Sequence, residues 1–280
     1  MAPKRFIPSK AVGRTLLYVL LIAGCAVMLL PFAWMISSSL KTEADVFTFP
    51  IQWIPSSPRW KNYQLIWEKV PLLNGFKNST ILTICTMVLQ ITTSSLAAYA
   101  FAKLEFTGRN FLFLAYVTTI AIPWQVYMVP QYIMMASWQL TDSLIGIIIM
   151  HAFTAFGVFM MRQFYMGIPN ELLEAARIDG LSEAGIWARI MVPLSKPAVA
   201  TLAITAFVFE WKDFMGPRIY LSSTSKQTLQ LVLRLFNTQY SSNYAQMMAA
   251  ATVALIPVFV LFCFLQRYFV QGVATSGLKG

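Results

Sequence analysis

The sequence has little charge and little of the chemistry that metal sites and disulfide-bonded domains use. Aspartate, glutamate, lysine and arginine together make up 11% of its 280 residues, whereas soluble proteins carry about a quarter. It has one histidine and three cysteines, and Cys25, Cys85 and Cys263 lie in separate apolar runs. That spacing fits neither a zinc site nor a disulfide framework, so we interpret the cysteines as packing residues. We expect no metal site in this chain.

Motifs of nucleotide-binding and hydrolytic proteins are missing as well. The sequence contains no G-x-x-x-x-G-K-[ST] phosphate loop and no H-E-x-x-H pair. It also lacks a Ser–His–Asp grouping within one polar domain. We therefore expect a chain that is not an enzyme, that binds no cofactor, and that does not bind ATP through a phosphate loop.

Long hydrophobic runs dominate what is present. Hydrophobic residues make up 58% of the chain and the mean hydropathy is +0.62, which predicts an all-α membrane protein. A span needs about 20 apolar residues, and six stretches meet this requirement. The predicted spans cover about 15–36, 78–102, 110–135, 144–161, 198–220 and 244–269, within a membrane domain at 15–270. The loop at 37–77 is rich in proline and tryptophan, which predicts short segments at the outer membrane interface.

The basic residues are distributed as in a protein whose N-terminus lies in the cytoplasm. Residues 1–14 contain four of them, and the apolar run that follows is longer than the roughly 7–15 residues of a signal-peptide core. With six spans, twelve of the 21 Lys and Arg residues fall on the cytoplasmic side, together with a tail at 271–280. We attribute the net charge of +10 to loops beside anionic lipid rather than to nucleic-acid binding.

Polar residues within the predicted spans are candidates for a solute path. An amide in lipid needs a hydrogen-bond partner, which singles out Gln90. His151 is a functional candidate because ionisable groups in spans are costly, and a hydrogen-bonded packing role is an equal alternative. Pro123 and Pro130 are expected to bend or break the third span, and broken helices line many transport paths. Gln125 lies between these two prolines.

Three charged residues near the end of the fifth predicted span form a second group of candidates. Glu210, Lys212 and Asp213 carry opposite charges and are expected to neutralise one another locally. Lys212 either faces an outer cavity, where it would suit an anionic sugar, or extends to the membrane interface.

The segment 168–197 is a polar stretch between two predicted spans, with four acidic and three basic residues. Asn170 is expected to cap a first helix, and Gly180 to end that helix in the left-handed conformation. Ser182 then caps a second helix, which Pro193 ends. The sequence thus predicts two short helices at an angle, in a loop on the cytoplasmic side.

This segment resembles the EAA loop of permease subunits of ABC importers. The pattern reads E-A-A, three residues, G, nine residues, I, any residue, L-P, and Val192 stands where the pattern has leucine. The matching residues are Glu174, Ala175, Ala176, Gly180, Ile190 and Pro193. The longer string EAARIDGLSEAGIWARIMVPLSKPA and the motif NYQLIW at 62–67 are similar to the carbohydrate-uptake branch, the maltose-type permeases.

The resemblance implies a type I ABC importer permease fold in the bacterial inner membrane. The first helix of the loop would be a coupling helix seated in a cleft of a separate ATPase, and the residues expected to take part are Glu174, Ala175, Ala176, Asp179, Gly180, Ile190 and Pro193. The implied partners are a second related permease, two ATP-binding subunits that use ATP and Mg²⁺, and an extracytoplasmic solute-binding protein. This chain would form half of a path for a sugar, an oligosaccharide or a related polyol.

Three alternatives remain open at this point. The importer could carry a non-carbohydrate solute such as a phosphorylated polyol. The chain could instead be an ion-coupled secondary transporter that uses Glu210, Asp213 and His151 as coupling groups. A membrane-embedded enzyme that uses one of the two carboxylates is the third.

Overall fold

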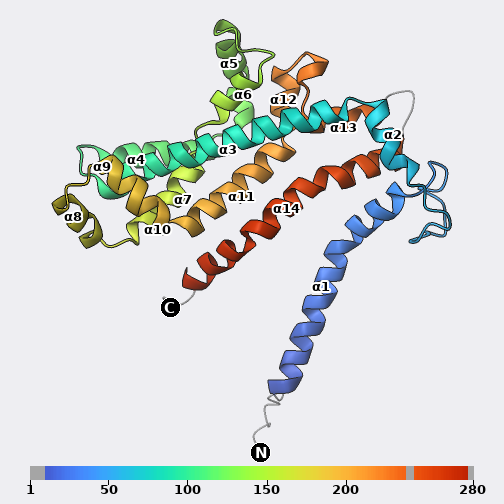
Figure 1. Ribbon diagram of the computed structural model, residues 1–280, viewed down its shortest axis with the longest axis horizontal. Helices are drawn as coiled ribbons and strands as arrows, with labels where there is room; N and C mark the ends of the chain where they lie inside the picture. The colour runs from blue at the N-terminus through green and yellow to red at the C-terminus, as the bar shows by residue number, and fades with distance from the viewer. Residues whose placement is uncertain (1–9, 238–242, 277–280) are drawn as a thin grey trace, which may run out of the picture. The chain divides into compact units, whose positions relative to one another are not determined.

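The computed structural model describes residues 10–237 and 243–276 (Figure 1). Most of the predicted cytoplasmic N-terminus and the end of the predicted tail lie outside these residues. The chain forms two units: one comprises Met1–Val70 with Phe236–Val253, and the other comprises Pro71–Leu235 with Ala254–Gly280.

Three helices are each long and apolar enough to cross a membrane: α1 (Lys10–Ser39), α3 (Leu72–Lys103) and α14 (Tyr244–Ser276). Three further candidates are bent pairs of helices. They are α4 (Arg109–Thr118) and η1 (Thr119–Ala121) with α5 (Trp124–Ser137), α6 (Leu144–His151) with α7 (Ala155–Met166), and the helical stretch Glu183–Leu194 with α11 (Lys196–Lys212). Six candidate spans result if each pair counts as one, and the all-α fold is confirmed.

The third predicted span, 110–135, is interrupted by a sharp bend. The two helices of this pair meet at 102°, because Ile122 is extended before Pro123, the conformation that a following proline favours. Pro123 directly precedes α5, whereas Pro130 lies within α5 without ending it. One of the two prolines therefore breaks the span and the other does not.

The fourth and fifth predicted spans are also divided. At 144–161, α6 and α7 meet at 42°, and the Thr154 hydroxyl accepts a hydrogen bond from the Gly157 N–H to cap α7. At 198–220, a continuous helix was expected, but α11 ends at Lys212 and a separate helix, α12 (Met215–Tyr220), follows. The turn between them forms because the Asp213 carboxylate accepts bonds from two α12 backbone N–H groups.

In the first unit, hydrogen bonds tie the segment after α1 to later parts of the chain. The Asn62 amide, in α2 (Lys61–Lys69), donates to the Ser39 and Lys41 carbonyls at 2.8 Å each. The Glu43 carboxylate accepts from the backbone N–H groups of Tyr244 and Ala245 and so caps the start of α14. Large apolar side chains of the predicted interfacial loop are exposed, among them Phe49, Trp53, Ile54 and Trp60.

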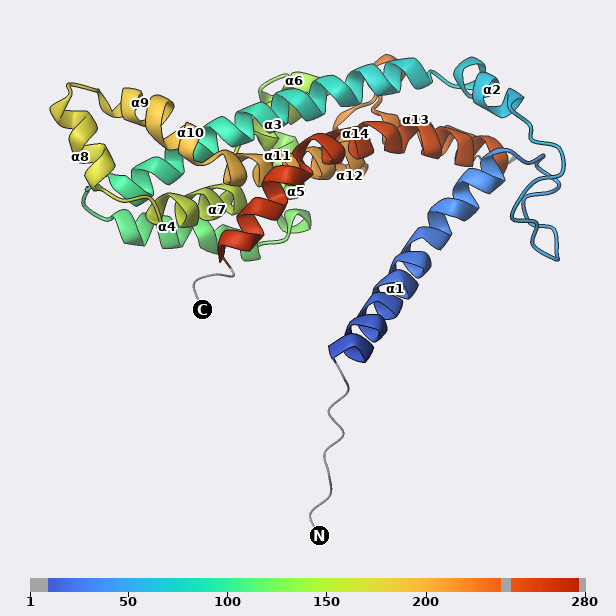
Figure 2. The same ribbon diagram turned by 60° about the horizontal axis from the view of Figure 1, so that its bottom comes forward.

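In the second unit, α3 lies side by side with α7 and α11 (Figures 1 and 2). The approach of α3 to α7 is close because Gly157 has no side chain: a Cβ there would lie 2.4 Å from the Ser94 hydroxyl. The Leu72 end of α3 contacts the segment that contains η3 (Thr224–Lys226), α13 (Leu229–Leu233) and η4 (Arg234–Phe236). There the Asn78 amide donates to the carbonyls of Ser225 and Gln227.

The interpretation of the cysteines as packing residues is wrong for the chain by itself. All three are free and exposed on α1, α3 and α14. Exposed apolar positions on helices of this length are the positions that lipid or another subunit would contact.

Candidate functional site

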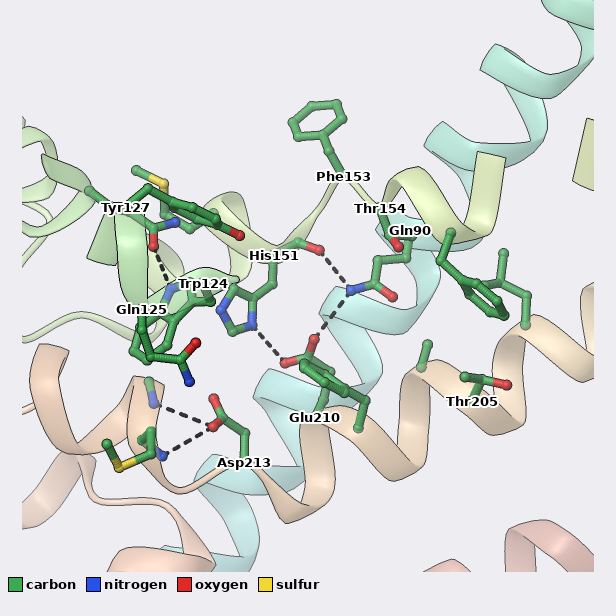
Figure 3. Close-up of a pocket in the computed structure, with 18 residues that line it drawn as sticks. Gln90, Trp124, Gln125, Tyr127, His151, Phe153, Thr154, Thr205, Glu210 and Asp213 are labelled. Atoms are coloured by element: carbon green, nitrogen blue, oxygen red, sulfur yellow. Dashed lines mark hydrogen bonds and ion pairs between the residues drawn. The ribbon is translucent and has the colours of Figure 1, made fainter. Parts of the chain in front are cut away.

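A cavity of about 490 Å³ lies in the second unit (Figure 3). Its walls come from α3, from the broken third and fourth spans, and from the region where α11 gives way to α12. The lining residues are Gln90, Trp124, Gln125, Tyr127, Gln131, Met150, His151, Phe153, Thr154, Phe156, Leu202, Thr205, Ala206, Phe209, Glu210, Asp213, Met215 and Gly216.

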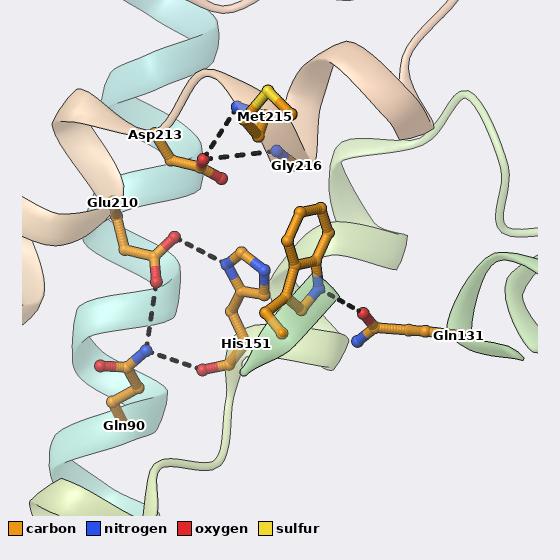
Figure 4. Close-up of polar contacts among 8 residues, drawn as sticks. Gln90, Gln131, His151, Glu210, Asp213, Met215 and Gly216 are labelled. Carbon is orange, nitrogen blue, oxygen red and sulfur yellow. Dashed lines mark hydrogen bonds and ion pairs between the residues drawn. The ribbon is translucent and has the colours of Figure 1, made fainter. Parts of the chain in front are cut away.

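A buried polar cluster joins three helices at the wall of the cavity (Figure 4). The Glu210 carboxylate lies 2.9 Å from His151 Nδ1 and accepts a hydrogen bond of 3.2 Å from the Gln90 amide. The same amide donates to the His151 carbonyl at 2.8 Å. His151 is the last residue of α6, so its carbonyl has no helical partner and is free to accept this bond. The cluster thus links α3, α6 and α11.

A second polar group lies on the α12 side of the cavity. Asp213 Oδ1 accepts from the N–H groups of Met215 and Gly216 at 3.1 and 3.3 Å, and the carboxylate also lines the cavity (Figure 4). On α5, the Gln131 side-chain oxygen accepts from the Trp124 indole N–H at 2.9 Å. This bond fixes the indole ring of Trp124 at the cavity wall.

The cavity combines aromatic rings with hydrogen-bonding groups and carries two carboxylates. No lysine or arginine is among its lining residues in the described part of the chain. Within that part, no cluster of His, Cys, Asp and Glu is arranged to hold a metal ion. Amides, carboxylates and a histidine between flat rings can bind a neutral, hydroxyl-rich molecule, because rings cover apolar faces while polar groups accept and donate hydrogen bonds.

Five of the six predicted path residues line this one cavity: Gln90, Gln125, His151, Glu210 and Asp213. Lys212 does not line the cavity, and its side chain is exposed. The expected local neutralisation among the three charged residues is also wrong for Glu210, which pairs with His151 from another helix. That these residues contact solute stays a prediction.

Sequence reasoning missed the aromatic wall, including Trp124, Tyr127 and Phe209. Aromatic residues are common throughout this chain, so composition gives no means of choosing among them. The one usable signal was the position of Trp124 directly after Pro123 at a predicted helix break.

The polar segment 168–197 forms two helical arms joined by a turn. The first is α8 (Glu171–Ile178); the second is a continuous stretch of α9 (Glu183–Ile186), the π-helical turn η2 (Trp187–Met191) and α10 (Val192–Leu194). Gly180 has φ +82° at the turn, and the Ser182 hydroxyl accepts a bond from the Gly185 N–H. Both of these expectations are confirmed.

One local expectation for this segment is wrong, and another holds to within one residue. Asn170 does not cap α8 with its side chain; its Oδ1 instead accepts a bond from Lys103 Nζ at 2.7 Å. The second helix ends at Leu194, one residue after Pro193, which was expected to end it.

The two faces of α8 differ in exposure. Leu173 and Ala176 are buried in a core that α3, α7 and α11 share. Glu174 and Ala175 are exposed on the opposite face, as are Asp179 and Gly180 just after the helix. Of the two small residues expected to admit another protein, only Ala175 is therefore accessible. In the second arm, Ile190 packs against the same core and Pro193 is exposed.

An ion pair holds the two arms together at their base. Arg177 Nε donates to Glu183 Oε1 at 2.8 Å. The same carboxylate accepts a second hydrogen bond, from the Tyr99 hydroxyl.

Comparison with known proteins relates this chain to transport permeases. The family described as "Binding-protein-dependent transport system inner membrane component" matches residues 90–275. The arabinooligosaccharides transport system permease protein AraQ of Halalkalibacterium halodurans is 36% identical over 227 residues, which are 81% of each chain. The melibiose/raffinose/stachyose import permease protein MelC of Bacillus subtilis is 34% identical, over 92% of this chain and 94% of its own.

Two further comparisons cover almost the whole chain. The sn-glycerol-3-phosphate transport system permease protein UgpE of Yersinia pestis is 31% identical over 92% of this chain. A bacterial ABC transporter involved in the import of the acidic polysaccharide alginate contains a chain with a TM-score of 0.83 and 23% identity, with 96% of this chain and 100% of that chain covered. That likeness shows the fold. With more than half of its length matched, the chain belongs to the binding-protein-dependent transport system inner membrane component family and is a multi-pass permease subunit of the bacterial inner membrane.

Proposed function

We propose that this permease forms half of the path of an ATP-driven importer for a neutral sugar or oligosaccharide, and that the cavity at Gln90, His151 and Glu210 contacts the solute. The observation that carries this proposal is the lining of the cavity, which combines aromatic rings with hydrogen-bonding groups and has neither lysine nor arginine among its described residues. Relatives named for the transport of arabinooligosaccharides and of raffinose support the carbohydrate class.

The exposed face of α8 is the proposed contact with an ATPase. Glu174 offers a charge, Ala175 allows a close approach, and Gly180 sets the turn behind them. With the cytoplasmic N-terminus and tail predicted from the charge distribution, α8 also faces the cytoplasm. A second permease, two ATP-binding subunits that use ATP and Mg²⁺, and a solute-binding protein complete the proposed assembly. Family membership supports the presence of an ATPase and a binding protein.

The charge of the cavity favours neutral solutes over anionic ones. A phosphorylated polyol would bring its negative charge close to Glu210 and Asp213, and the described lining has no lysine or arginine to offset it. Lys212, which would suit an anionic sugar, lies outside the lining. The glycerol-3-phosphate relative and the alginate neighbour show that other proteins of this fold are named for anionic solutes.

The decisive test is solute-stimulated ATP hydrolysis by the complete complex, purified with its ATPase and binding protein and placed in lipid vesicles. We expect neutral oligosaccharides to stimulate hydrolysis and to accumulate inside the vesicles, whereas glycerol 3-phosphate and uronate oligomers leave the basal rate unchanged. Stimulation by the anionic solutes alone would contradict the neutral class. Uptake that follows an ion gradient without ATP would contradict the ATP-driven mechanism and support Glu210, Asp213 and His151 as ion-coupling groups.

A further inference from the structure

One face of α3 is bonded to the segment 168–197 at three successive positions. Ser95, Tyr99 and Lys103 follow one another at intervals of four residues, so they lie on one stripe of the helix. Each makes a polar contact to a different part of that segment or of the helix leading into it. We call these three residues the α3 stripe.

The middle contact of the stripe joins three helices through one carboxylate. Tyr99 is buried, and its hydroxyl donates to Glu183 at the start of α9. The same carboxylate accepts from Arg177 of α8. A displacement of either arm of the segment therefore pulls on the same Tyr99 hydroxyl.

The other two contacts lie one helical turn to either side. Lys103 Nζ donates to the Ile168 carbonyl at 2.6 Å and to Asn170 Oδ1 at 2.7 Å, at the entry to α8. The Ser95 hydroxyl lies 2.6 Å from the Tyr165 hydroxyl of α7 and accepts from the Trp187 indole N–H at 2.8 Å. The stripe thus holds the entry, the base and the second arm of the segment.

The same helix carries a side chain into the cavity. Gln90 lies little more than one turn from Ser95, and its amide bonds to both Glu210 and the His151 carbonyl. Since α3 is continuous from Leu72 to Lys103, a shift of its Lys103 end moves Gln90 with it. The break between α6 and α7, next to His151, is where such a shift can be absorbed.

We propose that the α3 stripe is the mechanical link of this permease: Tyr99 and Lys103 are positioning residues that pass the movement of the segment 168–197 to Gln90 at the solute cavity. This proposal rests on the proposed ATPase contact at α8. The proposal gives the hydrophobic core and the polar stripe different roles. The core holds the segment in place, and the polar stripe fixes the axial position of α3 relative to it.

The experiment measures how many ATP molecules are hydrolysed per solute imported by the reconstituted complex. Tyr99→Phe removes the hydroxyl and keeps the ring in the core, and Lys103→Met keeps the alkyl chain. We expect each variant to hydrolyse ATP at near the wild-type rate while the ratio rises about three- to tenfold. Thermal unfolding, measured in parallel, should change little for Tyr99→Phe.

A double variant and matched controls sharpen this test. Tyr99→Phe with Glu183→Gln removes the same bond twice, so the ratio should not exceed that of the stronger single variant. Glu105→Gln and Lys69→Met change exposed side chains that make no hydrogen bond or ion pair recorded within the described residues, and the ratio should stay at the wild-type value.

Two outcomes would overturn the proposal. One is an unchanged ratio in both Tyr99→Phe and Lys103→Met. The other is a parallel loss of hydrolysis, import and thermal stability, which a purely structural role would produce. Failure of the proposed function has a different signature, because the wild-type complex itself would then show no ATP-dependent import of a carbohydrate.

Discussion

At the scale of single residues, Glu210 is the group on which the cavity cluster depends. Its side chain is 1% exposed and serves both His151 and Gln90. Glu210→Gln keeps the shape but removes the charge that strengthens these bonds. We expect the solute concentration for half-maximal ATPase stimulation to rise about tenfold, the effect of losing one hydrogen bond to a charged group. The measurement is a titration of the reconstituted complex with solute.

Lys212 provides the matched control for this variant, two residues further along the chain. Its side chain is exposed and does not line the cavity. Lys212→Met should leave the titration curve of a neutral oligosaccharide unchanged. A large shift with Lys212→Met and none with Glu210→Gln would contradict the assignment of the cavity.

Asp142 makes a pH-dependent contribution to stability. Bonds from the Ser223 hydroxyl, from two backbone N–H groups and from Lys226 hold the pKa of its carboxyl far below the usual range. A lowered folded-state pKa stabilises the protein above the unfolded-state pKa, near 4, and this stabilisation is lost as pH falls further. The melting temperature of the Asp142→Asn variant should therefore lie below that of wild type at pH 7, by a margin that shrinks below about pH 4.

Thermal unfolding followed by tryptophan fluorescence between pH 7 and pH 3 tests this prediction. Asn also tolerates the φ of +52° at position 142, so the substitution changes the charge without straining the backbone. Asp179→Asn is the control, because Asp179 is exposed and accepts no side-chain hydrogen bond recorded in the described residues. A margin that is independent of pH for Asp142→Asn would contradict the role of its charge.

At the scale of elements, Gly180 forms the turn between the two arms of the segment 168–197. Its φ of +82° suits glycine, asparagine tolerates it, and proline cannot adopt it. We expect Gly180→Pro to abolish import while the chain still inserts into the membrane, and Gly180→Asn to retain most import. Import assays paired with quantification of the protein in the membrane distinguish these cases. Normal import by an assembled Gly180→Pro complex would rule out the role of this turn.

The packing of α6 against the turn after α5 leaves no room for a side chain at Gly146. A Cβ at Gly146 would lie 2.4 Å from the Leu140 carbonyl oxygen, which belongs to the backbone and cannot rotate away. Gly146→Ala should therefore lower the free energy of unfolding by about 1–3 kcal/mol, the usual effect of overpacking. Gly24→Ala in α1 is the control, since no atom of the described chain lies within 4 Å of its Cβ position. Thermal unfolding of the two variants, side by side, gives the comparison.

The elements predicted well were those with local signals. Length and hydropathy predicted the helical stretches, and Gly180 and Ser182 predicted where the arms of the segment 168–197 meet, because caps and turns act within a few residues. The turn that ends α11 at Lys212 was missed, because it depends on where the Asp213 carboxylate points. The pairing of His151 with Glu210, 59 residues apart, was also beyond the sequence, since neither residue carries information about the helix it will face.

At the scale of the whole molecule, the predicted topology can be tested with two equally exposed isoleucines. Ile54 lies in the predicted outer loop and is 86% exposed, and Ile178 ends α8 and is 87% exposed. With the three native cysteines replaced by serine, a membrane-impermeant maleimide should label Ile54→Cys in right-side-out vesicles. It should label Ile178→Cys only in inside-out vesicles. Labelling of Ile178→Cys from the extracytoplasmic side would invalidate the ATPase contact at α8.

The cap that Glu43 places on the first turn of α14 has a consequence for how the chain is made. Glu43 leaves the ribosome early, and the backbone groups that it binds are synthesised about two hundred residues later. The first unit therefore stays incomplete during most of translation, because it cannot close until α14 has been synthesised. A product truncated before α14 would lack the backbone N–H groups that this carboxylate binds. Its first unit would stay open, and we expect proteases to cleave it there more readily.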